Sequence, residues 1–259
     1  MPTQFHTLAD GRRIAYRFNP GSAAASGPAL VFLPGYKSDM AGSKATAVLD
    51  WATAQDRACL LLDYSGCGES SGDFADGTLS RWRDEVIALL DAHGIDRAVL
   101  IGSSMGGWLM LLVTQALAQR GTGRIAALVG IAAAPDFTDW GVAQMDKGLL
   151  ADGETIWEDN PYGPEPTPTH PGFWADGQAN LVLDHGMEFD GPVRLIHGQC
   201  DPDVPWEISL RLAEALRSAQ VQVALIKDGD HRLSREGDIA LLLHTLDALI
   251  PLAPPPASA

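Results

Sequence analysis

Cysteines are few in this sequence, and long apolar runs are missing. The chain has three cysteines among 259 residues and no Cys-x-x-Cys pair. Neither a disulfide framework nor a zinc site is therefore predicted, and a reducing compartment is the simplest expectation. The first residues show no signal-peptide or transit-peptide pattern, and no segment reaches the roughly 20 apolar residues that cross a membrane. These absences predict a cytoplasmic location.

Basic residues are scarce relative to acidic ones. The chain has 18 lysines and arginines against 33 aspartates and glutamates, which gives a formal net charge of −15. Nucleic acid and anionic membrane surfaces would repel such a protein. We therefore expect no nucleic-acid partner and no stable membrane insertion. The sequence leaves the oligomeric state open.

Nucleotide-binding loops are also missing. Gly66 and Gly68 begin a dinucleotide-like pattern, but Ser71 stands where its third glycine is required. No phosphate-binding Gly-Lys-Ser or Gly-Lys-Thr occurs either. We interpret the loop as a structural turn and predict no cofactor and no metal.

What the chain does contain is a Gly-x-Ser-x-Gly pentapeptide between a strand pattern and a helix pattern. The apolar run Ala98–Ile101 precedes it, and a helical pattern over Leu109–Ala118 follows. The register is fixed, because Gly102 and Gly106 flank Ser104, whereas centring on the preceding serine would require glycine where isoleucine stands. This context is typical of a nucleophile elbow, in which small residues permit a tight turn that exposes the serine hydroxyl.

A nucleophilic serine needs a base and a carboxylate, and both follow later strands. The run Val193–Gly198 reads as a buried strand, with Asp201 and Asp203 in the next loop; His231 follows a strand at Val221–Lys227. Imidazole can take the serine proton and return it to the leaving group, and the carboxylate orients the imidazole. The order serine, carboxylate, histidine predicts a catalytic triad in which either aspartate can serve as the acid.

Two backbone amides must also stabilise the oxyanion that forms during acyl transfer. One is expected from Met105, directly after the serine. The other is expected from the loop after the strand at Ala29–Leu33, where Tyr36 is the candidate donor.

Alternating apolar strands and helices predict an α/β fold with a mostly parallel sheet covered by helices on both faces. The regular pattern stops for some fifty residues rich in Gly, Pro, Asp and Trp. We predict a core formed by residues 1–135 and 191–250, a cap insertion at 136–190, and a disordered tail at 251–259. Aromatic residues make the insertion too apolar for a free linker.

Taken together, the motifs resemble the α/β-hydrolase superfamily. Five of them are similar to a mitochondrial subfamily of serine hydrolases described as palmitoyl-protein thioesterases and acyl-glucuronide esterases. The five stretches are Leu33–Met40, Asp63–Ser70, Gly102–Met110, His197–Trp206 and Asp230–Arg232. The resemblance covers residues 29–250 and is weakest in the middle.

The resemblance implies a role for each residue of the triad. Ser104 would be the nucleophile, His231 the base, and Asp201 the acid, because Asp203 falls on a variable position of the His-Gly-x-x-Asp-x-x-Val-Pro pattern. His197 is interpreted as a strand-end histidine that hydrogen-bonds locally. No targeting extension is visible, so organelle residence is not carried over.

The predicted function is hydrolysis of esters or thioesters through an acyl-serine intermediate, with a small-molecule or acylated-protein substrate. S-acyl thioesters and acyl glucuronides are the substrates that the resemblance implies, and the cap is expected to bind medium to long acyl chains. The alternatives are a small-ester carboxylesterase, other cofactor-free chemistry of the same fold, and a non-catalytic binding protein.

Overall fold

The computed structural model describes residues 1–22, 27–161 and 163–253. In these residues eight strands form one sheet: β1 (Gln4–Thr7), β2 (Arg13–Asn19), β3 (Ala29–Leu33), β4 (Cys59–Leu62), β5 (Ala98–Ser103), β6 (Ile125–Ile131), β9 (Val193–Gly198) and β10 (Val221–Ile226). Their order across the sheet is β1-β2-β4-β3-β5-β6-β9-β10. β2 runs antiparallel to β1 and β4, and the other neighbouring pairs are parallel. The predicted fold class is confirmed.

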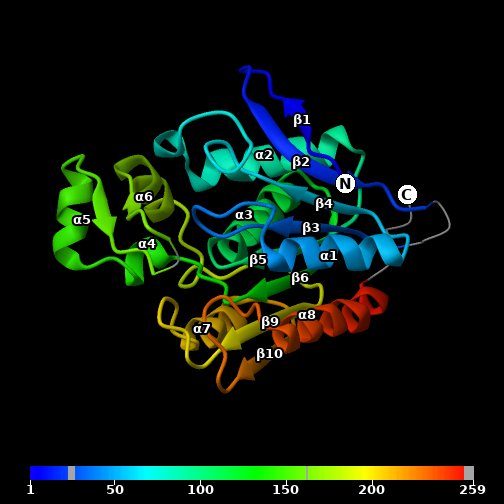
Figure 1. Ribbon diagram of the computed structural model, residues 1–259. Coiled ribbons are helices and arrows are strands. Elements are labelled where there is room, and N and C mark those ends of the chain that lie inside the picture. Colours follow the sequence, from blue (N-terminus) through cyan, green and yellow to red (C-terminus); the bar gives the residue numbers. More distant parts are fainter. Residues whose placement is uncertain (23–26, 162, 254–259) are drawn as a thin grey trace.

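Helices cover both faces of this sheet. The main ones are α1 (Ser43–Ala54), α2 (Leu79–Ala92), α3 (Met105–Gln119), α7 (Glu207–Ala215) and α8 (Glu236–Leu249), with short 3-10 helices η1 (Phe74–Asp76) and η2 (Ile250–Leu252). Side chains of β3 alternate between two cores: Val31 and Leu33 join the core under α2, α3 and α7, whereas Leu30 and Phe32 join the core under α1 and α8. Figure 1 shows this layering. Burial on both faces explains why the central strands are continuous apolar runs.

The predicted ranges agree closely with the elements around the site. β3 and β9 have the predicted bounds. The helix after the elbow is longer than predicted, because it begins at Met105 rather than Leu109. The elbow turn ends at Ser104, so the next four residues already have helical hydrogen bonding. β10 is an edge strand, which explains its alternating and partly exposed side chains.

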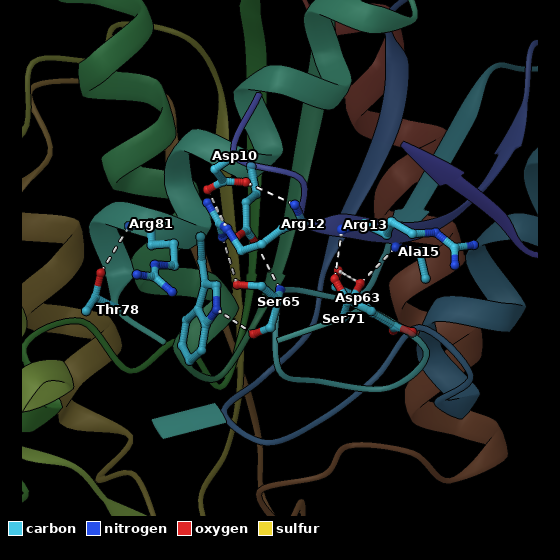
Figure 2. A network of polar contacts seen from close by, with 12 residues as sticks. Asp10, Arg12, Arg13, Ala15, Asp63, Ser65, Ser71, Thr78 and Arg81 are labelled. Atoms are coloured by element: carbon cyan, nitrogen blue, oxygen red, sulfur yellow. Dashed lines mark hydrogen bonds and ion pairs between the residues drawn. The ribbon is translucent and has the colours of Figure 1, made fainter. Parts of the chain in front are cut away.

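The β1–β2 hairpin is tied to the loop after β4 (Figure 2). Arg12 donates to Ser65 Oγ at 3.1 Å and forms an ion pair with the buried Glu85 of α2. Farther along the loop, Ser71 Oγ accepts the Arg13 amide at 2.8 Å. These contacts fix a loop that also supports the active site, as described below.

In the segment predicted as a cap, the described residues (136–161 and 163–190) form three short helices and a two-stranded antiparallel sheet. They are α4 (Phe137–Trp140), α5 (Gln144–Ala151), β7 (Ile156–Glu158), β8 (Thr167–Thr169) and α6 (Pro171–Gln178). In Figure 1 these elements lie together at one end of the sheet, apart from its helical layers. The domain boundaries stay predictions. Of the predicted disordered tail, residues 251 and 252 belong to η2, and residues 254–259 lie outside the described residues.

No helix within the described ranges combines the length and apolarity that crossing a membrane requires.

Candidate active site

Ser104 lies in a sharp turn between β5 and α3. Its backbone φ of 55° and ψ of −121° are strained for a residue that carries a side chain. The Ser104 amide donates to Ile131 O at 2.9 Å, and Ser104 O accepts the Ala134 amide at 3.1 Å. This turn places Ser104 in the wall of a pocket.

The glycines of the elbow are required by backbone contacts. A Cβ on Gly102 would lie 2.2 Å from Gly106 O, and a Cβ on Gly106 would lie 2.0 Å from Leu33 O. Both distances are far below van der Waals contact. The pentapeptide pattern therefore has a steric cause in this chain.

Three side chains from distant parts of the sequence form a hydrogen-bonded chain. His231 Nε2 lies 3.1 Å from Ser104 Oγ, and His231 Nδ1 lies 2.8 Å from Asp201 Oδ2. The three residues follow β5, β9 and β10, so they meet at the carboxyl ends of parallel strands. Asp203, the alternative acid, is exposed and donates its amide to Asp201 Oδ1 at 2.9 Å. The geometry thus gives the orienting contact to Asp201.

The Asp201 side chain is fully buried and accepts four hydrogen bonds. Two come from the imidazoles of His197 and His231, and two come from the amides of Asp203 and Val204. Burial alone would raise the pKa of Asp201, but the hydrogen bonds from His197 and His231 outweigh it and hold that pKa well below its ordinary value. Asp201 is therefore a carboxylate at neutral pH, suited to hold a hydrogen on His231 Nδ1.

Ligand atoms of Asp201, Asp203 and His231 lie within 4.8 Å of one another, a spacing that a metal ion could use. However, His231 Nδ1 already faces Asp201, whose oxygens accept four donors. A metal would have to displace these hydrogen bonds, so the arrangement fits a triad better than a metal centre.

The loop after β3 runs against the elbow. A Cβ on Gly35 would lie 3.3 Å from Ser104 Cβ, so the chain from Pro34 to Tyr36 passes beside the serine. Met105 begins α3, whose N-terminal amides carry partial positive charge. The two predicted oxyanion donors, the amides of Tyr36 and Met105, therefore belong to segments that adjoin Ser104.

Asp63 and Tyr64 hold this loop at its two ends. The Tyr64 hydroxyl donates to Pro34 O at 3.0 Å, and the Asp63 carboxylate accepts the Met40 amide at 2.7 Å. Both side chains are buried. In the sequence, Asp63 stands out only as the first residue of one of the five stretches, because a hydrogen bond between separate loops leaves no local signal.

The pocket above the elbow has a volume of about 650 Å³, which is within the range of small-molecule sites. Ser104 and His231 lie in its wall, and the inserted segment contributes Phe137 and Trp140. Much of the remaining lining is charged: Lys37, Asp39, Lys44, Glu158, Asp159, Asp203 and Arg232.

The other aromatic residues that the structure describes in the insertion do not line the pocket. Phe173 is buried, with its ring centroid 4.6 Å from that of Tyr36 and 5.7 Å from that of Trp82. Trp157 is 63% exposed. These aromatics join the insertion to the core or face solvent, so the apolar part of the pocket is smaller than the composition of the insertion suggested.

Lys44, in the first turn of α1, is a pocket residue that the sequence did not single out. Its ammonium group donates to Arg232 O and to Ser234 Oγ, the latter at 3.4 Å, so it holds the loop that carries His231. Burial, and to a smaller extent the charge of Arg232, lower the pKa of Lys44 to about 8.

The fold agrees with what comparison finds. The sequence profile of the alpha/beta hydrolase family matches residues 30–255. The chain belongs to this family. It is 34% identical over 232 residues to the human protein named palmitoyl-protein thioesterase ABHD10, mitochondrial, covering 86% of this chain and 73% of the relative. Membership and the names of these relatives make it a hydrolase of ester or thioester bonds.

Solved structures support the same placement. A putative hydrolase from Agrobacterium vitis S4 superposes with a TM-score of 0.89 at 37% identity, covering 96% of this chain and 100% of the other. Alpha/beta hydrolase domain-containing protein 10 from mouse gives a TM-score of 0.85 at 33% identity, covering 96% and 98%. The resemblance to the thioesterase subfamily is thereby confirmed.

The prediction of a cytoplasmic location is wrong by the same comparison. The human relative and those from orangutan, mouse, rat and cattle are all named mitochondrial. The prediction depended on the absence of a targeting pattern and of disulfide-forming cysteines, and neither absence identifies a compartment.

Proposed function

We propose that this hydrolase cleaves fatty-acyl thioesters through an acyl-serine intermediate on Ser104. The observation that carries the proposal is the hydrogen-bonded chain from Ser104 through His231 to the buried Asp201. Ser104 and His231 line a pocket of about 650 Å³. The relatives named palmitoyl-protein thioesterase supply the substrate class.

In the first half of the reaction, Ser104 Oγ attacks the thioester carbonyl carbon while His231 Nε2 takes its proton. The amides of Tyr36 and Met105 donate to the oxyanion, and Asp201 stabilises the imidazolium. Collapse breaks the carbon–sulfur bond, and His231 returns the proton to the leaving thiolate. In the second half, water attacks the acyl-serine with His231 as base, which releases the carboxylic acid and restores Ser104.

The second candidate function is hydrolysis of an ester with a polar leaving group, and the charged residues in the pocket wall favour it. Lys44 and Arg232 could receive an anionic alcohol, as in the acyl glucuronides that the sequence resemblance implies. The same triad would cleave the oxygen ester. The two candidates differ in which half of the substrate the pocket recognises.

Matched thioesters and oxygen esters with acyl chains of about two to sixteen carbons, assayed with wild type and Ser104→Ala, test the proposal. We expect Ser104-dependent turnover of thioesters that rises with chain length. Turnover confined to short oxygen esters would leave a small-ester carboxylesterase, and preference for an acyl glucuronide would favour the second candidate.

A fluorophosphonate probe tests whether the protein is an enzyme of this kind or a binding protein of the same fold. We expect labelling of wild type and none of Ser104→Ala. Absence of labelling in wild type would contradict an activated serine.

A further inference from the structure

His197 is a second histidine on the triad carboxylate. It stands near the end of β9, and its side chain is fully buried. His197 Nε2 lies 3.2 Å from Asp201 Oδ2, the same oxygen that lies 2.8 Å from His231 Nδ1. Two imidazoles therefore share one carboxylate oxygen, and the proposed mechanism uses only one of them.

The other contacts of His197 fix which ring nitrogen carries hydrogen. Nε2 also lies 3.0 Å from Val204 O, and a carbonyl oxygen can only accept, so Nε2 is the donor. Nδ1 lies 2.7 Å from Ser209 Oγ on α7, whose hydroxyl can donate to it. The ring is thus held from both sides, with its N–H shared between Val204 O and the Asp201 carboxylate.

We propose that His197 is a positioning residue that sets the basicity of the catalytic pair. Its hydrogen bond to Asp201 Oδ2 fixes the carboxylate and draws charge away from the contact with His231. A carboxylate with one donor fewer would stabilise the His231 imidazolium more strongly. As the pH is lowered, the enzyme would then lose its catalytic base at a higher pH than wild type does. The inference rests on the triad proposed above.

Other ionisable groups face this cluster and must be held constant in any test. Asp203 lies on the loop of Asp201, Asp230 and Arg232 flank His231, and Lys44 of α1 binds the loop that carries His231. Glu158 and Asp159 face the same pocket from the inserted segment. Since none of these is changed in the variants below, their contributions cancel in a comparison with wild type.

The test is the pH profile of kcat/KM, from about pH 5 to about pH 9, for wild type, His197→Leu and His197→Gln. Leucine removes the hydrogen bond, whereas the glutamine amide can place a donor where imidazole Nε2 stands. We expect the acidic limb of the kcat/KM profile to lie about half a pH unit to one pH unit higher in His197→Leu than in wild type. A shift of one unit corresponds to the loss of one charge-assisted hydrogen bond of ordinary strength. His197→Gln should return the limb toward the wild-type position.

A matched control separates this effect from the loss of any buried histidine. His93 packs against Tyr16 and Phe18 at the far end of α2, so His93→Leu should leave the limb in place. A His197→Leu enzyme with lower kcat and an unmoved limb would overturn the inference and leave His197 a purely structural residue. An equal shift in His93→Leu would overturn it as well.

Two further variants keep the test decisive. If His197→Leu does not fold, Ser209→Ala releases Nδ1 without removing the ring, and a smaller shift in the same direction is expected; an unmoved limb there would overturn the inference. Ser104→Ala distinguishes a failure of the proposed function from a failure of the inference about His197. Its retained activity would overturn the proposed function and this inference together, whereas a Ser104-dependent enzyme with an unmoved limb would overturn only the inference.

Discussion

At the elbow, backbone atoms lie so close to Gly106 that no side chain fits there. A Cβ there would lie 2.0 Å from Leu33 O and 2.6 Å from Pro34 O, both backbone atoms at the start of the oxyanion loop. Gly106→Ala must therefore push that loop away from Ser104. We expect a loss of stability of about 1–3 kcal/mol, as for other overpacked sites, and a fall in kcat/KM of at least about 100-fold, as when one oxyanion donor is lost. Thermal unfolding and steady-state kinetics measure both.

Gly148, in the middle of α5, is the matched control. An added Cβ there meets nothing within 4 Å. Gly148→Ala should therefore stabilise the protein by about 0.5–1 kcal/mol, the usual gain in a helix, and leave kcat/KM unchanged. Equal losses in the two variants would contradict the steric account of the elbow.

The Tyr64 hydroxyl group holds the loop after β3, which carries the predicted oxyanion donor Tyr36, in position. Tyr64→Phe keeps the ring that stacks on Trp82, with centroids 5.3 Å apart, but leaves Pro34 O without its donor. We expect kcat to fall about tenfold with KM little changed, because a buried acceptor left unpaired costs about 1–3 kcal/mol and the loss acts where oxyanion charge develops. Affinity for a boronic-acid transition-state analogue should fall in parallel.

Tyr16→Phe provides the comparison, since its hydroxyl donates to Gln4 Oε1 at 3.2 Å in the β1–β2 hairpin, away from the pocket. Its kcat should match wild type. If Tyr64→Phe also matched wild type, the Tyr64 hydrogen bond would have no part in holding the loop for catalysis.

At the scale of elements, β5 and β9 could be predicted because burial on both faces makes them continuous apolar runs, and β10 because its residues alternate as in an edge strand. Ser104, Asp201 and His231 were found since each follows such a strand. His197 and Asp63 were not found as parts of the site. The Asp63 contact joins separate loops, which leaves no local signal. His197 does hydrogen-bond locally, as predicted, but a strand-end histidine is by itself an ordinary residue.

The inserted segment could not be predicted in detail, since tertiary contacts rather than local sequence hold its short elements. The Trp174 indole donates to Thr138 O at 3.1 Å, and Gly177 lies so close to Thr138 that a Cβ would be 2.6 Å from its side chain. The run Ala175–Gln178 contains a glycine, a residue that favours turns. Packing against α4 instead keeps it within α6.

Asp136, at the start of the inserted segment, is hydrogen-bonded to two residues near the end of the segment. Its buried carboxylate accepts the amides of Val182, at 2.9 Å, and Leu183, at 2.8 Å. Asp136→Ala leaves both amides unpaired, so we expect a loss of about 2–4 kcal/mol in urea denaturation, at about 1–3 kcal/mol for each unpaired group. Limited proteolysis should cut faster between residues 137 and 181.

Asp139→Ala removes a neighbouring carboxylate whose ion pair with Lys147 is solvent-exposed. Such pairs contribute about 0–1 kcal/mol, so this variant should resemble wild type in both assays. Similar behaviour of the two variants would show that Asp136 does not fasten the segment.

For the whole molecule, Lys44 links the pocket to the dependence of stability on pH. Its pKa is lowered to about 8 in the folded protein from 10.5, so between these values the unfolded chain binds a proton that the folded chain does not. The free energy of unfolding therefore rises with pH in this window on account of Lys44. Relative to Lys44→Met, wild type should gain of the order of 2 kcal/mol between about pH 7 and about pH 10.

Urea denaturation of both proteins at the two pH values measures this gain. Ionisation of the buried thiols Cys59 and Cys67 is common to both proteins and cancels in the difference. A difference that stays flat with pH would mean that Lys44 remains charged and well solvated in the folded protein.

We propose above that catalysis proceeds through an acyl group on Ser104, with His231 as the base and Asp201 orienting His231. The most direct measurement is mass spectrometry of the protein quenched in acid during turnover of a long-chain acyl thioester, followed by peptide mapping. We expect one added acyl group on the peptide that contains Ser104 in wild type, and none in Ser104→Ala. Steady turnover with the acyl group on another residue, or equal turnover by Ser104→Ala, would contradict it.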